Sequence, residues 1–245
     1  MVIQVVFVHG IRTSATMWRA QIAHLTERGI PTAAVDLPAH GTRMAEPFTL
    51  DEAFATLDAA VQDAATRGPV LLVGHSMGGL LSTAYLGREN PPISGLIAAS
   101  CTAFPRGAGL AAYRFATHAM AALPDHGRWL ADRVLQATLP EATRADFGAG
   151  GYAFLAQDTA LKSLATLDLA AALTRIQVPT WFVNGQFDQL RINEQTFCRL
   201  VPHAELIVVP RTTHLVTAMR PRVFNAVLDL AVATVSAGDR ARTPT

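Results

Sequence analysis

The sequence predicts an α/β fold, in which a mostly parallel sheet of about six strands is covered by helices on both faces. Six short apolar runs rich in Val, Ile and Leu recur along the chain without alternating in polarity, as expected for strands buried on both faces. Helical patterns separate these runs, which is the order of βαβ units. Half of the 245 residues are hydrophobic and 16% are charged, so the chain can bury a large core.

The expected strands span residues 2–8, 32–35, 70–73, 95–99, 180–183 and 205–209. A helix is expected over 17–27, where apolar residues recur at helical spacing before Gly29 stops the pattern. A second helix is expected over 51–66 with Asp51 as its cap, and a last one over 221–235.

One segment interrupts the alternation, because residues 102–173 contain Ala-rich helical stretches and no convincing strand. A structureless loop of this length is uncommon, so the segment is predicted to be a helical cap inserted into the fold. The α/β core then comprises residues 1–101 and 174–235, and the polar tail 236–245 is expected to be disordered.

The charge balance and the cysteines narrow the functional class. The net charge is +1, which gives no electrostatic footprint for nucleic acid or an anionic membrane. Cys101 and Cys198 are too few for a disulfide scaffold and are expected to be free thiols. No leader pattern or membrane span is visible, so a cytoplasmic monomer or homodimer acting on a small molecule is expected.

The chemistry-bearing motif is Gly-His-Ser-Met-Gly at 74–78, which joins the strand 70–73 to a helical pattern. This is G-x-S-x-G in the strand–turn–helix context that the motif requires. Ser76 would sit on a sharp, strained turn, where small neighbours at Gly74 and Gly78 avoid clashes. Its hydroxyl would stand above the sheet at a helix N-terminus, which favours developing negative charge. We therefore expect Ser76 to be a nucleophile.

Five motifs in order resemble the α/β-hydrolase superfamily, in the branch of esterases, lactonases and cofactor-free haloperoxidases. They are Phe-Val-His-Gly at 7–10, Asp-Leu-Pro-Ala-His-Gly at 36–41, Gly-His-Ser-Met-Gly-Gly at 74–79, Asn-Gly-Gln-Phe-Asp at 184–188, and His214. The resemblance covers nearly the whole chain and implies a serine hydrolase that requires neither a cofactor nor a metal.

A serine hydroxyl needs a base to take its proton, and eight histidines could serve. His214 is favoured because it follows the strand 205–209 by a short loop, at the sheet edge where ligands bind in such folds. His9 and His40 lie in glycine turns, where a structural role is expected. By the resemblance, His75 points sideways from the elbow into the structure.

The base needs a carboxylate that fixes its tautomer. Asp188 follows the strand 180–183, and the order Ser76, Asp188, His214 matches the resembled superfamily. Some relatives carry the acid one strand earlier, where this chain has Ser-Cys-Thr at 100–102. Asp36 is the rival, although a loop-tying or capping role fits it better.

Acyl transfer also needs two donors aimed at the developing oxyanion. One is the backbone N–H of Met77, directly after the nucleophile, and the resemblance implies Ile11 N–H as the other. Arg12 could clamp an anionic group of the substrate. The alternative is an arginine at the rim, paired with a local carboxylate or with water.

The expected reaction is hydrolysis of a carboxylic ester, lactone or thioester through an acyl-enzyme. Carbon–carbon bond hydrolysis, perhydrolysis or a receptor that retains the fold are the alternatives. The superfamily's hydroxynitrile lyases carry Lys directly after the histidine, where this chain has Leu215. Phe104 and Leu215 are candidate walls of a largely apolar substrate pocket.

Overall fold

The computed structural model describes residues 2–88, 91–107, 110–111, 114–115, 118–119 and 122–242. Six strands form one sheet in the order β2-β1-β3-β4-β5-β6, and each neighbouring pair is parallel. The strands are β1 (Gln4–Val8), β2 (Thr32–Val35), β3 (Val70–His75), β4 (Gly95–Ala99), β5 (Thr180–Gly185) and β6 (Glu205–Val209). All six expected strands and the α/β fold class are thereby confirmed.

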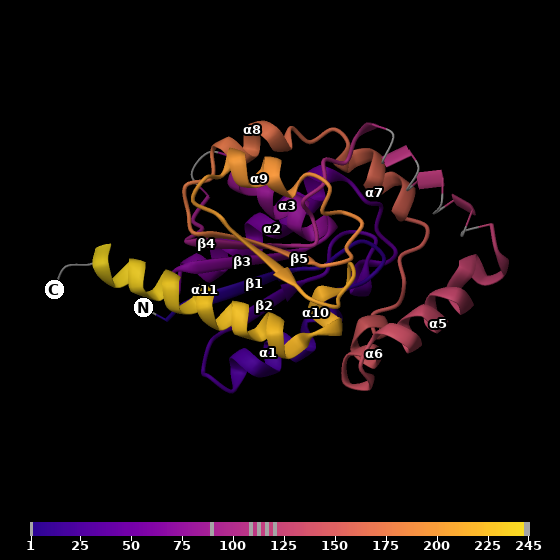
Figure 1. The fold of residues 1–245 in the computed structure, drawn as a ribbon, viewed down its shortest axis with the longest axis horizontal. Coiled ribbons are helices and arrows are strands. Elements are labelled where there is room, and N and C mark those ends of the chain that lie inside the picture. Colours follow the sequence, from indigo (N-terminus) through magenta and orange to yellow (C-terminus); the bar gives the residue numbers. More distant parts are fainter. Residues whose placement is uncertain are drawn as a thin grey trace.

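Helices cover both faces of this sheet (Figure 1). One face carries α1 (Arg19–Thr26) and α11 (Pro221–Arg242), which contact each other. The opposite face carries α2 (Leu50–Ala65), α3 (Met77–Leu86), α8 (Leu169–Thr174) and α9 (Glu194–Leu200). Short helical turns lie in the connections, namely η1 (Ala15–Trp18), η2 (Gly41–Arg43) and α10 (Val216–Met219).

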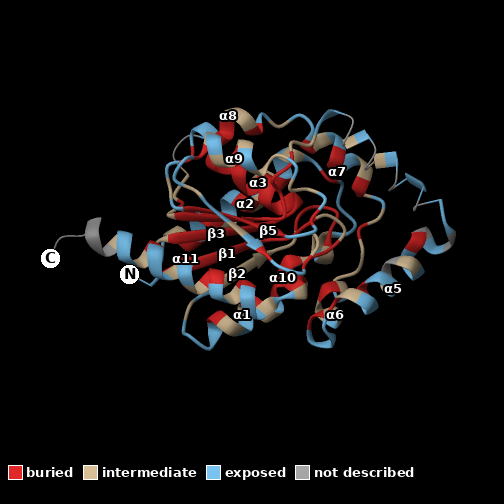
Figure 2. Ribbon diagram, in the orientation of Figure 1, coloured by how far each residue is buried: buried red, intermediate tan, exposed pale blue. Residues whose placement is uncertain are grey.

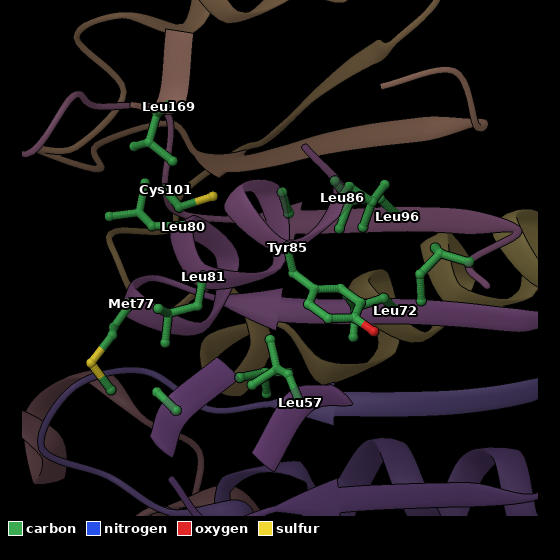
Figure 3. Packing of buried hydrophobic residues seen from close by; sticks show 14 of the residues in the cluster. Leu57, Leu72, Met77, Leu80, Leu81, Tyr85, Leu86, Leu96, Cys101 and Leu169 are labelled. Atoms are coloured by element: carbon green, nitrogen blue, oxygen red, sulfur yellow. The ribbon is translucent and has the colours of Figure 1, made fainter. Parts of the chain in front are cut away.

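Each face of the sheet buries its own hydrophobic core. The four central strands β1, β3, β4 and β5 are buried along their whole length, whereas the edge strands β2 and β6 are partly exposed (Figure 2). The core beneath α2 and α3 packs aliphatic side chains and Tyr85 along the length of α3 (Figure 3). The core beneath α1 and α11 is aromatic at its centre. The ring of Trp18 stacks on that of Phe7 with centroids 4.8 Å apart, and its centroid lies 6.0 Å from that of Phe224. The sheet is therefore packed against a hydrophobic core on each face, and functional residues can lie on the loops at the ends of its strands.

The described residues of 102–173, between β4 and β5, form helices joined by turns and irregular segments, with no strand among them. They include η3 (Pro124–Gly127), α5 (Arg128–Thr138), α6 (Glu141–Gly148) and α7 (Gln157–Leu164). The hydroxyls of Thr13 and Thr16 donate to the carbonyls of Phe147 and Asp146, and Arg19 pairs with the Asp146 carboxylate at 3.1 Å. These contacts fasten α6 to the loop that follows β1.

Two expectations about helix ends are wrong. The cap of α2 is Thr49, whose hydroxyl accepts from the Glu52 N–H at 3.2 Å, and Asp51 lies inside the first turn. A helix N-cap satisfies a free N–H with a side-chain oxygen, and the threonine is placed to do so.

The last helix, α11, continues through residues 236–242, which were expected to belong to a disordered tail. Residues 243–245 of that tail lie outside the described residues. α11 spans 22 residues, and no helix in the described part of the chain is long and apolar enough to cross a membrane.

Candidate active site

Ser76 stands alone between the last residue of β3 and the first residue of α3. Its backbone adopts φ 53°, a left-handed conformation that an L-residue adopts only under constraint. Two hydrogen bonds hold it there: the Ser76 N–H donates to the Ala99 carbonyl at 2.8 Å, and the Ser76 carbonyl accepts from the Leu80 N–H at 3.0 Å. The adjoining strand and the first turn of the helix therefore lock the strained turn.

The glycines on either side of Ser76 are required by close backbone contacts. A Cβ at Gly78 would overlap the carbonyl oxygens of Val8 and His9, and a Cβ at Gly74 would overlap the carbonyl of Gly78. The start of α3 is thus packed directly onto the end of β1. This explains physically why the elbow has small residues two positions before and two positions after the serine.

The structure brings together three side chains from the ends of three different strands. His214 Nε2 lies 2.9 Å from Ser76 Oγ, and His214 Nδ1 lies 3.0 Å from Asp188 Oδ1. A carboxylate only accepts, so the proton of a neutral imidazole resides on Nδ1 and leaves Nε2 to accept from the serine hydroxyl. The order donor, base and carboxylate is the arrangement that activates an alcohol as a nucleophile.

Asp188 is set up to remain an anion. Its side chain is fully buried, and its Oδ1 also accepts from the Leu190 N–H at 2.8 Å. Burial alone acts to raise the pKa of this carboxyl. The hydrogen bond and charge of His214 and the hydrogen bond from the Leu190 N–H, with the Ser100 hydroxyl nearby, outweigh burial and hold the pKa of Asp188 below its ordinary value.

Sequence reasoning passed over Ser100 as a contributor to this site. The residue directly follows β4 and adopts φ 53°, and its N–H donates to the Val183 carbonyl at 2.8 Å. A serine after a strand carries no signal of its own. Only the pairing of β4 with β5 places its hydroxyl next to Asp188.

The other histidines that were weighed have structural partners. His9 Nε2 accepts from the Leu37 N–H at 3.0 Å, and its Nδ1 lies 2.7 Å from the Gly10 carbonyl. His40 Nδ1 bonds the Pro38 carbonyl at 2.8 Å. His75 Nε2 bonds the backbone carbonyl of His214 at 2.9 Å and so supports the loop that carries that residue.

Asp36 has the loop-tying role that was expected for it. Its Oδ1 accepts from the Ala15 N–H at 2.8 Å, and its Oδ2 accepts from both the N–H and the hydroxyl of Thr42. The carboxylate thus joins the loop after β1 to the loop after β2. The hydrogen bond to His214 is made by Asp188 and not by this rival.

Two cavities open beside Ser76. The large cavity has a volume of about 620 Å³, and its walls include Ile11, Ser76, Met77, Leu80, Leu161 and Ile192. The small cavity has a volume of about 310 Å³, and its walls include Ile11, Ser76, Val134, Phe147, His214 and Leu215. Both volumes fall in the range of roughly 300–1,000 Å³ that is typical of small-molecule sites.

The three candidate pocket residues all line one of these cavities. Phe104 borders the large cavity and packs against Phe197 with ring centroids 5.1 Å apart. Leu215 and Arg12 border the small cavity. The Arg12 guanidinium lies over the Phe154 ring, 4.4 Å from its centroid, which is a cation–π contact that neither interpretation of Arg12 anticipated.

The two residues that were expected to supply oxyanion donors lie beside Ser76. Met77 is the first residue of α3, where a backbone N–H has no partner within the helix. Ile11 borders both cavities, in the loop that follows β1. Gly10 lets this loop approach closely, because a Cβ there would lie 2.8 Å from His75 Nδ1 and 3.3 Å from Ser76 Cβ.

Comparison with known proteins agrees with this architecture. Lipase LipV of Mycobacterium tuberculosis is 40% identical over 80 residues, a match that spans 32% of this chain and only 30% of the lipase. A thermophilic esterase from Thermogutta terrifontis superimposes with a TM-score of 0.74 at 21% identity, covering 95% of this chain and 90% of the esterase.

Two further solved structures share the fold. Bromoperoxidase from Bacillus anthracis has a TM-score of 0.78 at 19% identity, and the enol-lactonase from Burkholderia xenovorans LB400 has 0.68 at 17% identity. Each match covers 95% of this chain and 92% of the other. The model of the alpha/beta hydrolase family matches residues 5–227, and the chain belongs to that family.

Proposed function

We propose that this alpha/beta hydrolase cleaves carboxylic esters, including lactones and thioesters, of small and largely apolar substrates with Ser76 as nucleophile. The observation that carries the proposal is the hydrogen-bonded series from Ser76 Oγ through His214 to the buried Asp188, at 2.9 and 3.0 Å. Apolar walls on both sides of the serine support an apolar substrate. Esterase and lipase names among similar proteins are consistent with it.

The first half of the reaction forms an acyl-enzyme. His214 Nε2 takes the proton of Ser76 Oγ as the oxygen attacks the carbonyl carbon, and the carbonyl oxygen becomes an oxyanion. The N–H groups of Ile11 and Met77 would donate to this oxyanion. The tetrahedral intermediate then collapses, the bond to the alcohol oxygen breaks, and His214 Nε2–H gives its proton to that leaving oxygen.

The second half releases the acid. His214 Nε2 takes a proton from water, whose oxygen attacks the acyl carbon, and the same donors hold the new oxyanion. Collapse expels Ser76 Oγ, which recovers its proton from His214. One ester and one water thus yield one carboxylic acid and one alcohol, and Asp188 remains ionised beside the imidazolium throughout.

We also propose that the helical segment 102–173 acts as the cap of this site. Val134 on α5 and Leu161 on α7 reach the two cavities, so this segment supplies walls on both sides of Ser76. Substrate choice would then depend on the insertion, while the chemistry depends on the sheet.

The test of the proposed function is hydrolysis of p-nitrophenyl acetate and butyrate, together with labelling by a fluorophosphonate probe. We expect turnover and labelling in the wild type and the loss of both in Ser76→Ala. Ser82→Ala is the matched control, because Ser82 is another buried serine, inside α3, and this variant should retain both signals. If the wild-type protein neither turns over esters nor is labelled at Ser76, it is not a serine hydrolase. This is the result expected of a receptor that retains the fold.

A further inference from the structure

The large and the small cavity meet at the nucleophile. Ser76 and Ile11 belong to the walls of both, so each cavity reaches the position where the carbonyl carbon of a substrate would sit. Beyond this shared wall the two diverge. The large cavity continues over Leu80 on α3 and Leu161 on α7, whereas the small cavity continues toward Val134 on α5.

Reaction geometry restricts which part of an ester can occupy each cavity. In the tetrahedral intermediate, the carbon bears Ser76 Oγ, the oxyanion, the acyl chain and the leaving oxygen. The serine and the oxyanion donors fix two of these four directions. The acyl chain and the leaving group must take the remaining two, one toward each cavity.

The position of the base determines which group goes where. His214 Nε2 must reach the leaving oxygen to protonate it, so this oxygen lies on the imidazole side of the carbon. His214 and its neighbour Leu215 border the small cavity. The described walls of the large cavity include Met77 and Leu80 on α3, and they do not include His214.

We propose that the large cavity receives the acyl chain and that the small cavity receives the alcohol part of the ester. This inference rests on the proposed function. The preferred substrate class is then an ester whose apolar acyl group is larger than its alcohol. The large cavity has a volume of about 620 Å³, and its walls are formed mostly by aliphatic side chains. Such walls favour a hydrocarbon chain over a charged one.

The experiment measures kcat/KM along two ester series. The acyl series contains p-nitrophenyl esters from acetate to octanoate. The alcohol series contains alkyl acetates from methyl to hexyl, whose hydrolysis is measured by the release of acid. In the wild type, kcat/KM is expected to rise about fourfold per methylene along the acyl series. Along the alcohol series the rise should stop at a shorter chain, because that cavity has half the volume.

Two exposed rim residues allow each cavity to be narrowed separately. Ile192 borders the large cavity and is 69% exposed, and Val134 borders the small cavity and is 51% exposed, so tryptophan is tolerated at both without disturbing the core. Leu155→Trp is the matched control, since Leu155 is 88% exposed and lines a separate groove near Phe48.

Ile192→Trp is expected to lower kcat/KM for the octanoate about tenfold relative to the acetate, with the alcohol series unchanged. Val134→Trp should lower kcat/KM for hexyl acetate relative to methyl acetate by a similar factor. It should lower kcat/KM of all p-nitrophenyl esters alike, so the ratio of octanoate to acetate in the acyl series is expected to stay unchanged. Leu155→Trp should leave the dependence of kcat/KM on chain length unchanged in both series.

Three outcomes overturn the assignment: exchanged effects of the two variants, an effect of each variant on the chain-length dependence of both series, or no effect of either variant on its series. In all three, the wild type still hydrolyses esters and Ser76 still labels, so the proposed function stands. Absence of ester turnover together with an unlabelled Ser76 is a different result, in which the proposed function itself fails.

Discussion

At the scale of single residues, Asp188 is a buried carboxylate that contacts the His214 imidazole. The carboxylate has no exposed side-chain surface, yet its hydrogen bonds keep it ionised. An anion at this place favours the Nδ1–H tautomer of His214, and in the proposed mechanism it would stabilise the imidazolium that forms during attack. The role is therefore electrostatic as well as geometric, and a neutral isostere should not replace it.

We expect Asp188→Asn to lower kcat about 10⁴-fold, because an amide N–H facing His214 Nδ1 would select the tautomer that cannot accept the serine proton. The measurement is steady-state hydrolysis of p-nitrophenyl butyrate at pH 7.5. Asp36→Asn is the control, since that carboxylate ties two loops and should affect Tm far more than kcat. Retention of more than a tenth of the wild-type kcat in Asp188→Asn would contradict the assigned role.

The residues that sequence reasoning located are those placed by the order of strands and loops. Ser76, Asp188 and His214 each follow an apolar run, and parallel strands end at one edge, so their meeting follows from topology. The stacking of Arg12 on Phe154 could not be foreseen, because residues 142 positions apart meet only through the fold of the insertion. The division into two cavities depends on the same packing.

At the scale of secondary-structure elements, the elbow depends on the contact between α3 and β1. Gly78 lies against the backbone carbonyls of Val8 and His9, and neither can move without disturbing the centre of the sheet. The loop that follows this strand carries Ile11. Pressure at Gly78 would therefore act on the fold and on the oxyanion site together.

Gly78→Ala is expected to lower the free energy of unfolding by about 3 kcal/mol, because the added methyl group overlaps rigid backbone. Gly238→Ala is the matched control on α11, where nothing lies within 4 Å of the new Cβ, and it should stabilise the protein by about 0.5 kcal/mol. Urea denaturation of both variants provides the comparison. Equal effects of the two substitutions would show that the elbow is not tightly packed.

Helices and strands could be predicted where one local sequence pattern determines them. Helix ends were misplaced where two sequence signals compete. The strands were found because buried parallel strands are continuous apolar runs. The start of α2 was misplaced because Thr49 and Asp51 are both capping types, and only the contact with the Glu52 N–H identifies the cap. The end of α11 was placed too early because a polar composition resembles a disordered tail when the helix period is weak.

At the scale of the whole molecule, the fold encloses ionisable groups that are neutral in the native state. His9 and His75 are both buried. Burial, followed by the charge of a neighbouring histidine, lowers the pKa of His9 to about 3 and that of His75 to about 4. For His9 the neutral form is also required by geometry, because its Nε2 accepts from the Leu37 N–H.

These shifts make the stability of the whole fold depend on pH. In the unfolded chain the two imidazoles take up protons near pH 6.5, whereas in the native state they do so only near pH 3 and 4. Between these values the unfolded state binds more protons, so the free energy of unfolding decreases as the pH falls. The stabilisation is fully present above about pH 6.5, and each histidine accounts for a loss of about 2 kcal/mol between pH 7.5 and pH 5.

We therefore expect urea denaturation of Ser76→Ala, which separates folding from turnover, to show a free energy of unfolding that falls steeply from pH 6.5 to pH 4.5. Adding His9→Gln should lower stability at pH 7.5, because the bond from Leu37 is disturbed, and should also make the slope shallower by about 1.4 kcal/mol per pH unit. His203→Gln is the control, since His203 is exposed and should leave the slope unchanged. An unaltered slope in the His9→Gln variant would mean that His9 is protonated in the native protein, which is incompatible with its acceptor role toward Leu37.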